Sequence, residues 1–355
     1  MPLPLVPLVI GGYVVGSATL LAFPQLLHRR LGQAKRLRHG SHRGGSAEAT
    51  ENTLPAFRNA VRAGSQLLEL DVHLTADEHV VVVHDPELSR LCGVAATVAN
   101  TRYADLPRYL PPEELVLPPP FHAPKVTLAE TATPEMLAAE RDSPPGDLRR
   151  MPLLSEVFEE FPDTFVNIDL KGRDPNGVLL RKVHELIVSH KRQANTCWGS
   201  FDDAKTRACY EADPSIPLLF SAKRSVVLLA LFYSGLLPFV SLKESYLEIP
   251  LLTAADQRRV QGYGYLPSGS GLGNSLKRGL AQTAGWLLRS KILFSHLEKR
   301  GISTLVWTYN EEKEFEEAFG AGVTGVMTDY PSRLRKFLDE KDAAEAAADA
   351  PRSRM

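Results

Sequence analysis

The chain has 355 residues, with 41 basic and 42 acidic side chains and a formal net charge of −1. This balance argues against a nucleic-acid partner, because nucleic-acid-binding proteins usually show a large basic excess or a basic stripe. Apolar residues make up 44% of the chain, which is enough for a sizeable core and argues against wholesale disorder. The three cysteines form no C-x-x-C pair, so neither a disulfide scaffold nor a structural zinc site is expected.

The amino-terminal 28 residues contain no Asp, Glu, Lys or Arg. Their apolar run, residues 6–27, reaches the length of about 20 residues that a helix needs to span a bilayer. We therefore predict a retained transmembrane anchor over residues 1–28, with a cleaved signal peptide and a buried core helix as the alternatives. The basic segment 29–38 would hold the rest of the chain on the cytosolic side by the positive-inside rule, which alone does not fix the membrane face.

Beyond residue 35, short apolar or β-branched runs alternate with longer helical patterns. The predicted strands are 37–42, 67–73, 80–84, 165–170, 196–200, 216–220, 303–308 and 325–328. The predicted helices are 53–63, 154–161, 177–190, 202–212 and 311–321. This order predicts an α/β fold, a (β/α)8 barrel over residues 39–338, because eight is the strand number that closes such a barrel. The run 246–251 is a ninth candidate, so the strand count alone is not proof.

Four segments depart from the barrel pattern. Residues 107–152 hold 11 of the 26 prolines, which a barrel helix does not tolerate, so an insert over 86–152 is predicted after the third strand. A second apolar run, 225–242, is interpreted as a membrane-interfacial segment, with a buried barrel helix as the alternative. The glycine-rich stretch 262–273 is predicted to be a loop, and residues 339–355 a frayed or disordered tail.

Polar side chains stand at the ends of the strand candidates, where a (β/α) barrel places its active site. Glu69, Asp71 and His73 alternate along one strand, so all three point to the same face. Asp169 and Lys171 share a face of a later strand for the same reason. Two other strand candidates end in polar pairs, namely His42 with Arg43 and His84 with Asp85.

Three carboxylates converging at a barrel mouth would repel one another unless a cation compensates them. A divalent cation, Mg²⁺ or Ca²⁺, is the natural partner of Glu69, Asp71 and Asp169. Arg43 and Lys171 add positive charge for an anion such as phosphate, and two histidines can divide general-base and general-acid duties. Each residue alone has a structural explanation, but their recurrence at strand ends predicts a metal-dependent phosphodiesterase site.

The motifs HRGGSAEATENTLPAF, ELDVHLTADEHVVVVHDPEL, NIDLKG, VWTYN and GVTGVMTDYP resemble the glycerophosphodiester phosphodiesterase family in order and spacing. The resemblance covers roughly residues 39–338 and implies a (β/α)8 barrel with an insert after the third strand. It assigns a role to each matching side chain. The general acid/base pair would be His42 and His84, the metal ligands Glu69, Asp71 and Asp169, and the substrate contacts Arg43, Lys171 and Trp307.

This sequence departs from the family pattern at one of the predicted metal ligands. Asp169 stands where the family more often has Glu, which keeps the carboxylate on a shorter arm. Asn310 and Asp329 belong to the two late motifs and would have supporting roles.

The apolar amino terminus, the GLLPFV run and the GVMTDYP ending resemble the membrane-bound animal lysophospholipase D branch of this family. This resemblance implies hydrolysis of lysophosphatidylcholine-type lipids and N-acyl lysophosphatidylethanolamine to lysophosphatidic acid, and a location in the endoplasmic reticulum membrane. The alternatives are hydrolysis of soluble glycerophosphodiesters to glycerol 3-phosphate, a phospholipase C-type cleavage, and a non-catalytic membrane lipid-binding protein.

Overall fold

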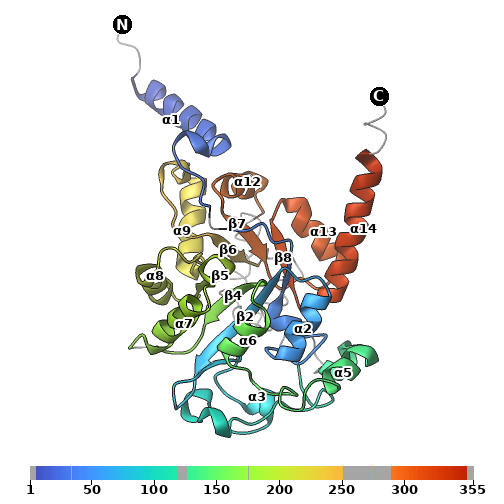
Figure 1. Cartoon of the computed structure of the whole chain (residues 1–355). Coiled ribbons are helices and arrows are strands. Elements are labelled where there is room, and N and C mark those ends of the chain that lie inside the picture. The colour runs from blue at the N-terminus through green and yellow to red at the C-terminus, as the bar shows by residue number, and fades with distance from the viewer. Residues whose placement is uncertain are drawn as a thin grey trace.

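Parallel strands form a barrel at the centre of the protein, and helices surround it (Figure 1). The computed structural model describes residues 5–32, 34–117, 126–174, 176–250, 273 and 289–349. Apart from Gly273, the predicted glycine-rich loop lies outside these residues. The strands are β1 (His39–Ser41), β2 (Leu67–Leu74), β3 (Val80–Val82), β4 (Phe165–Leu170), β5 (Thr196–Gly199), β6 (Tyr246–Ile249), β7 (Ser303–Val306) and β8 (Gly325–Thr328).

The strands follow the order β5–β4–β2–β1–β8–β7–β6, and each neighbouring pair on this path is parallel. Leu218 and Leu219 join the two edge strands, because they form parallel bridges with Trp198 of β5 and Tyr246 of β6. This segment occupies the eighth strand position of a nearly closed parallel barrel. The predicted (β/α)8 barrel is therefore confirmed.

The prediction of one barrel strand, residues 80–84, is wrong, and the ninth candidate, 246–251, forms a barrel strand instead. Residues 80–84 contain β3, which pairs antiparallel with β2 and lies off the barrel path. Only residues 75–79 separate these two strands, a connection too short for the crossover of about a dozen residues that a parallel neighbour needs. The run 246–251 contains β6, a barrel strand.

Helices cover the outside of the barrel, and the five predicted helices are confirmed within a few residues. These are α2 (Leu54–Arg62), α6 (Leu154–Glu160), α7 (Val178–Ser189), α8 (Asp203–Ala212) and α13 (Glu312–Ala321). The other described helices are α1 (Leu5–Ala22), α3 (Ser89–Cys92), α4 (Leu128–Thr131), α5 (Pro134–Arg141), α9 (Ala222–Tyr233), α12 (Lys291–Lys299) and α14 (Pro331–Asp349). The short helices α3 to α5 lie within residues 86–152, the predicted insert, and α14 continues into the segment predicted as a tail.

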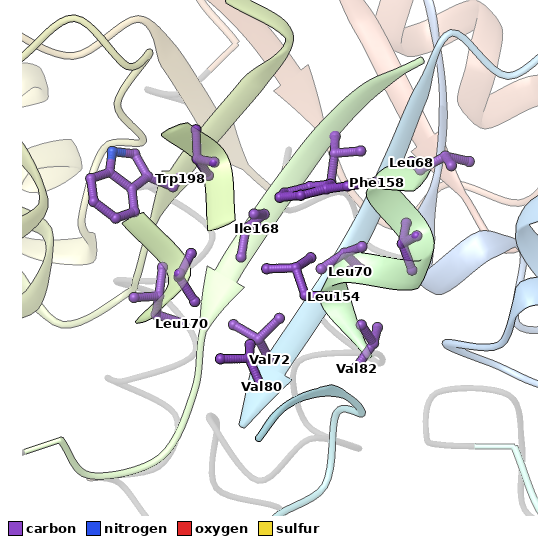
Figure 2. Close-up of a cluster of buried hydrophobic side chains, with 14 of the residues drawn as sticks. Leu68, Leu70, Val72, Val80, Val82, Leu154, Phe158, Ile168, Leu170 and Trp198 are labelled. Carbon is purple, nitrogen blue, oxygen red and sulfur yellow. The ribbon is translucent and has the colours of Figure 1, made fainter. Parts of the chain in front are cut away.

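Successive side chains along the strands point in turn to the outer core and to the barrel interior, which separates the core residues from the site residues. Leu68, Leu70 and Val72 of β2 point away from the barrel axis and pack with α6, where Leu154 and Phe158 meet them (Figure 2). The intervening residues of β2 face the barrel interior. On β4, Ile168 and Leu170 belong to the same outer cluster. The apolar even-numbered positions therefore fix the register that turns the polar odd-numbered positions inward.

The helix α1 packs on the barrel at the end where the strands begin. Ser17 Oγ donates to the Gly235 carbonyl oxygen (2.8 Å), just beyond α9, and the Leu21 carbonyl oxygen lies 3.0 Å from His296 Nδ1 on α12. Since α9 and α12 precede β6 and β7, these contacts place α1 opposite the ends of the strands that bear the site. In Figure 1, α1 and the helices α3 and α5 accordingly lie at opposite ends of the molecule.

The predicted transmembrane helix is not found. Among the described residues, no helix combines the length and the apolar character needed to cross a membrane. The helix α1 ends at Ala22, whereas the predicted span continued to Leu27, because Pro24 begins a separate turn over Pro24–Leu26. The second apolar run, 225–242, contains most of α9 as a barrel helix, with Leu228 buried and Val226 67% exposed.

Gly325 lies where β8 meets the chain leading into β1. A Cβ atom at this position would stand 2.0 Å from the Leu37 carbonyl oxygen, a backbone atom that the barrel holds in place. We expect Gly325→Ala to lower the free energy of unfolding by about 1–3 kcal/mol or more, as overpacked cores do. Urea denaturation followed by circular dichroism measures this loss.

Gly320 on α13 provides the control, because a Cβ there meets no described atom within 4 Å. Gly320→Ala should leave the stability unchanged or raise it by up to about 1 kcal/mol through helix propensity. An equal loss of stability in both variants would contradict the packing assigned to Gly325.

Candidate active site

The eight predicted site residues all line one cavity of about 470 Å³ at the end of the barrel where the strands terminate. They come from separate strands and strand ends that meet only in the folded barrel. His42 and Arg43 follow β1, Glu69 and Asp71 lie on β2, His84 follows β3, Asp169 and Lys171 lie on and after β4, and Trp307 follows β7. The structure thus brings all of them together, while their individual roles stay predictions.

A buried carboxylate holds His42. The Nδ1 atom of His42 lies 2.7 Å from Oδ1 of Asp329, which follows β8, the neighbour of β1. Asp329 also accepts hydrogen bonds from Ser46 Oγ (2.6 Å) and Asn310 Nδ2 (2.9 Å), so its position is fixed. Burial alone would lower the pKa of His42, but the Asp329 carboxylate raises it above the usual 6.5.

His84 has a different environment. Its Nδ1 atom lies 2.6 Å from Oδ1 of Asp85, whose other oxygen accepts from Arg90 Nε at 2.6 Å. Burial, followed by the positive charge of Arg43, lowers the pKa of His84 below the usual 6.5. The surroundings therefore shift the two histidine pKa values in opposite directions, an arrangement typical of an acid/base pair.

Glu51 links the arginine of the insert to the arginine after β1. Arg90 on α3 donates to both Glu51 carboxylate oxygens at 2.9 Å, and Arg43 Nη1 donates to Glu51 Oε1 at 3.0 Å. Burial would raise the pKa of Glu51, but the two arginines lower it to about 2. The ion pairs continue through Asp85 to His84, so α3 of the insert helps to position both Arg43 and His84.

Lys171 lies between two of the predicted metal ligands. Asp71 and Asp169 are direct neighbours in the β2–β4 register, and Lys171 Nζ lies 3.1 Å from Asp71 Oδ1 and 2.7 Å from Asp169 Oδ2. Burial would lower the pKa of Lys171, but the two carboxylates raise it. Asn52, in the loop before α2, donates to the other oxygen of Asp71 (3.0 Å).

The negative charge of the carboxylates that line the cavity is not fully balanced by the cationic side chains around them. Burial, then the charge of Asp71, raises the pKa of Glu69 to about 8, although Glu69 accepts a hydrogen bond from the Arg43 backbone amide. Asp169 Oδ1 is buried and has no hydrogen-bond partner in the described structure.

In the described part of the chain, no three His, Cys, Asp or Glu side chains are arranged as a ready metal site. The arrangement of Asp71 and Asp169 around the Lys171 ammonium accounts for this. The oxygen donors Glu69, Asp71 and Asp169 nevertheless fit a hard divalent cation in chemistry, because such a cation would satisfy Asp169 Oδ1 and the charge of Glu69.

Glu51 and Asn52, on the loop after β1, are among the residues that the sequence indicates for the site, whereas two other contributors are not predicted from it. Arg90 contacts Asp85 beside His84, and Glu248 of β6 lines the cavity. A charged residue between the apolar residues of YLEIP is a signal that could have identified Glu248, since an inward carboxylate in a strand requires a function or a partner. His73 lies behind the site, where its Nε2 atom is 3.0 Å from the His84 carbonyl oxygen.

Comparisons with known proteins show which sequences and folds the chain resembles. The sequence profile described as the glycerophosphoryl diester phosphodiesterase family matches residues 42–333. The human protein named lysophospholipase D GDPD1 is 41% identical over 329 residues, which cover 93% of this chain and 95% of that protein. The human protein named lysophospholipase D GDPD3 is 35% identical over 335 residues, which cover 94% of this chain and 95% of that protein.

Solved structures support the fold alone. A glycerophosphoryl diester phosphodiesterase domain from Mycobacterium tuberculosis superimposes with a TM-score of 0.58 at 16% identity, covering 84% of this chain and 98% of that one. A phosphodiesterase from Oleispira antarctica, solved in complex with the product sn-glycerol-3-phosphate, superimposes with a TM-score of 0.54 at 19% identity, covering 85% of this chain and 97% of that one.

The contact between His42 and Asp329 generates a pKa prediction. We expect Asp329→Asn to lower the pKa of His42, because burial would then act without the opposing negative charge. A pH titration of the His42 ring followed by NMR measures the shift. The control is Asp213→Asn, which removes a carboxylate beside His184 on the outside of the barrel and should not change the pKa of His42. An unchanged His42 pKa in Asp329→Asn would show that Asp329 does not set it.

Proposed function

Because the chain belongs to the glycerophosphoryl diester phosphodiesterase family, in its animal lysophospholipase D branch, we propose that it hydrolyses lysophospholipids to lysophosphatidic acid and the head-group alcohol. Family membership makes the chain a phosphodiesterase acting on glycerophosphodiester-type or lysophospholipid-type substrates. The observation that supports the finer proposal is the pair of histidines with opposite pKa shifts on one cavity that also holds Arg43 and Lys171.

The proposed reaction divides the proton transfers between the two histidines. His42, whose pKa is raised, holds a proton and donates it to the head-group oxygen as its bond to phosphorus breaks. His84, whose pKa is lowered, is neutral and accepts the proton of the attacking water as the new bond to phosphorus forms. Asp329 and Asp85 orient the two rings through their Nδ1 atoms, which leaves each Nε2 atom for the reaction.

The proposed cofactor is a divalent cation, Mg²⁺ or Ca²⁺, and the proposed ligands are Glu69, Asp71 and Asp169. When bound, such a cation neutralises non-bridging phosphate oxygens as a Lewis acid. The buried Asp169 Oδ1 atom without a partner supports this assignment. Lys171 would then lie beside both the ligands and the phosphate, where its ammonium contributes positive charge to the substrate.

The proposed partner surface is a lipid membrane, with the endoplasmic reticulum as the proposed location. A set of exposed apolar side chains around the first part of α1, the α1 patch, comprises Leu8, Val9, Ile10, Val14 and Val15, each at least 56% exposed. Exposed Arg29 and Arg30 follow α1 after the turn Pro24–Leu26. Apolar side chains followed by cations suit contact with a bilayer that contains anionic lipids, so we propose that the protein contacts the membrane through α1.

Purified protein should release choline from lysophosphatidylcholine, EDTA should stop the release, and added Mg²⁺ or Ca²⁺ should restore it. We expect His42→Ala and His84→Ala each to lower kcat by roughly 10²-fold or more, because each removes one proton transfer. A choline assay measures the rate, and mass spectrometry identifies the lipid product.

His190→Ala is the control, because His190 lies at the end of α7 and does not line the cavity. Phosphocholine as the product would instead indicate a phospholipase C-type reaction. Turnover of glycerophosphocholine alone would indicate soluble substrates, and lipid binding without turnover would indicate a non-catalytic protein.

The α1 patch generates a membrane prediction. Replacing Val9 and Val15 together by Glu should weaken binding to vesicles of phosphatidylcholine and phosphatidylserine by about 10-fold or more, because two apolar side chains no longer enter the interface. Vesicle sedimentation measures the bound fraction. Val188→Glu on α7 changes an exposed valine outside the patch and should bind like the unchanged protein. Equal binding of all three proteins would exclude the α1 patch as the membrane contact.

A further inference from the structure

Besides the catalytic residues, the cavity is lined by several apolar side chains. Three of them follow β5, β6 and β7, and two more are residues 219 and 220. They are Phe201, Leu219, Phe220, Pro250 and Trp307, and the mechanism above gives none of them a chemical task. These side chains therefore suit a portion of the substrate that takes no part in proton transfer.

Besides the three proposed metal ligands, the described residues that line the cavity include one more carboxyl group, that of Glu248. Glu248 is on β6, lines the cavity, and accepts a hydrogen bond from Asn167 Nδ2 at 2.5 Å. Among the described residues it forms no ion pair, whereas Asp71 and Asp169 both pair with Lys171. A carboxylate among apolar side chains is costly unless a cation joins it. Burial, then the charge of Asp169, accordingly raises the pKa of Glu248 to about 8.

Two aromatic side chains, Phe201 and Trp307, line the same cavity as this carboxyl group. The rings of Phe201 and Trp307 meet edge to face with their centroids 5.8 Å apart, and Phe201 is half exposed at the cavity. The Lys171 ammonium already lies 5.8 Å from the Phe201 ring centroid, so this ring accepts a cation on its face. Aromatic faces together with a carboxylate are the groups that bind quaternary ammonium ions.

We propose that Glu248, Phe201 and Trp307 form the subsite for a positively charged amine head group, such as choline, on the substrate. The inference rests on the proposed lysophospholipase D function and names the substrate class of the same site. Lys171, the proposed phosphate contact, lines the same cavity as Glu248 and lies 5.8 Å from the Phe201 ring centroid, so the subsite adjoins the phosphate position as a phosphocholine group requires. An acyl chain is the poorer occupant, because it leaves the Glu248 carboxyl without a counter-charge.

The first test compares two lysophospholipids with the same acyl chain, one with choline and one with glycerol as head group. Glu248→Gln keeps the size of the side chain and a hydrogen-bonding group for Asn167 but removes the charge. We expect it to lower kcat/KM for lysophosphatidylcholine by about 10-fold or more, as the loss of a desolvated charge contact does, and to leave kcat/KM for lysophosphatidylglycerol unchanged. An equal fall for both substrates, or a changed preference for acyl-chain length only, would overturn the assignment.

Glu48→Gln is the matched control. Glu48 is also buried, has a pKa raised by burial, and accepts hydrogen bonds from Ser332 rather than lining the cavity. It should leave the ratio of the two kcat/KM values unchanged. A shift in this ratio equal to that of Glu248→Gln would overturn the proposal, because the effect would then come from removing any buried carboxylate.

A binding measurement separates the subsite from the activity. Tetramethylammonium titrated into the full chain should bind in isothermal titration calorimetry, and both Glu248→Gln and Trp307→Leu should weaken this binding by about 10-fold. Binding that persists in a protein without head-group release would overturn the proposed function and leave the subsite standing. Head-group release combined with tetramethylammonium binding that neither substitution weakens would overturn the subsite.

Discussion

The crowding of like charge inside the barrel governs the structure of the site. Period-two alternation on β2 turns Glu69 and Asp71 inward, and the β2–β4 register places Asp169 directly beside Asp71. This register cannot slip, because the apolar residues at the alternate positions fill the outer core. The chain therefore supplies cations and amide donors from other segments, among them Lys171 beside the two aspartates.

Neighbouring charges also explain why the pKa values of His42 and His84 shift in opposite directions. Asp329 lies beside His42 and accepts its other hydrogen bonds from two neutral side chains, Ser46 and Asn310. Because neither donor carries a charge, the negative charge of Asp329 acts on the His42 ring. At His84, burial and then the positive charge of Arg43 lower the pKa, and the hydrogen bond with Asp85 does not reverse this shift. Asp85 also pairs with Arg90, so the helix α3 that supplies Arg90 helps to fix the carboxylate beside His84.

Local patterns in the sequence predict much of this arrangement, and contacts between distant segments supply the rest. Alternation along β2 and β4 is local, so the inward carboxylates are predictable from the sequence. The five-residue connection before β3 was also local, and loop length alone could have excluded 80–84 as a barrel strand. The contact between His42 and Asp329 depends on β8 pairing with β1, 287 positions apart in the sequence, and no local pattern encodes that distance.

The position of α1 bears on why single-chain lipids suit this protein. The proposed α1 patch and the cavity lie at opposite ends of the barrel, so a protein resting on a bilayer through α1 would receive its substrate from the aqueous side. Each buried CH₂ group holds a lipid in the bilayer with about 0.8 kcal/mol. A second acyl chain of about 16 carbons would therefore add roughly 12 kcal/mol to the cost of leaving the bilayer. That cost favours lysophospholipids over two-chain phospholipids before any contact with the cavity is made.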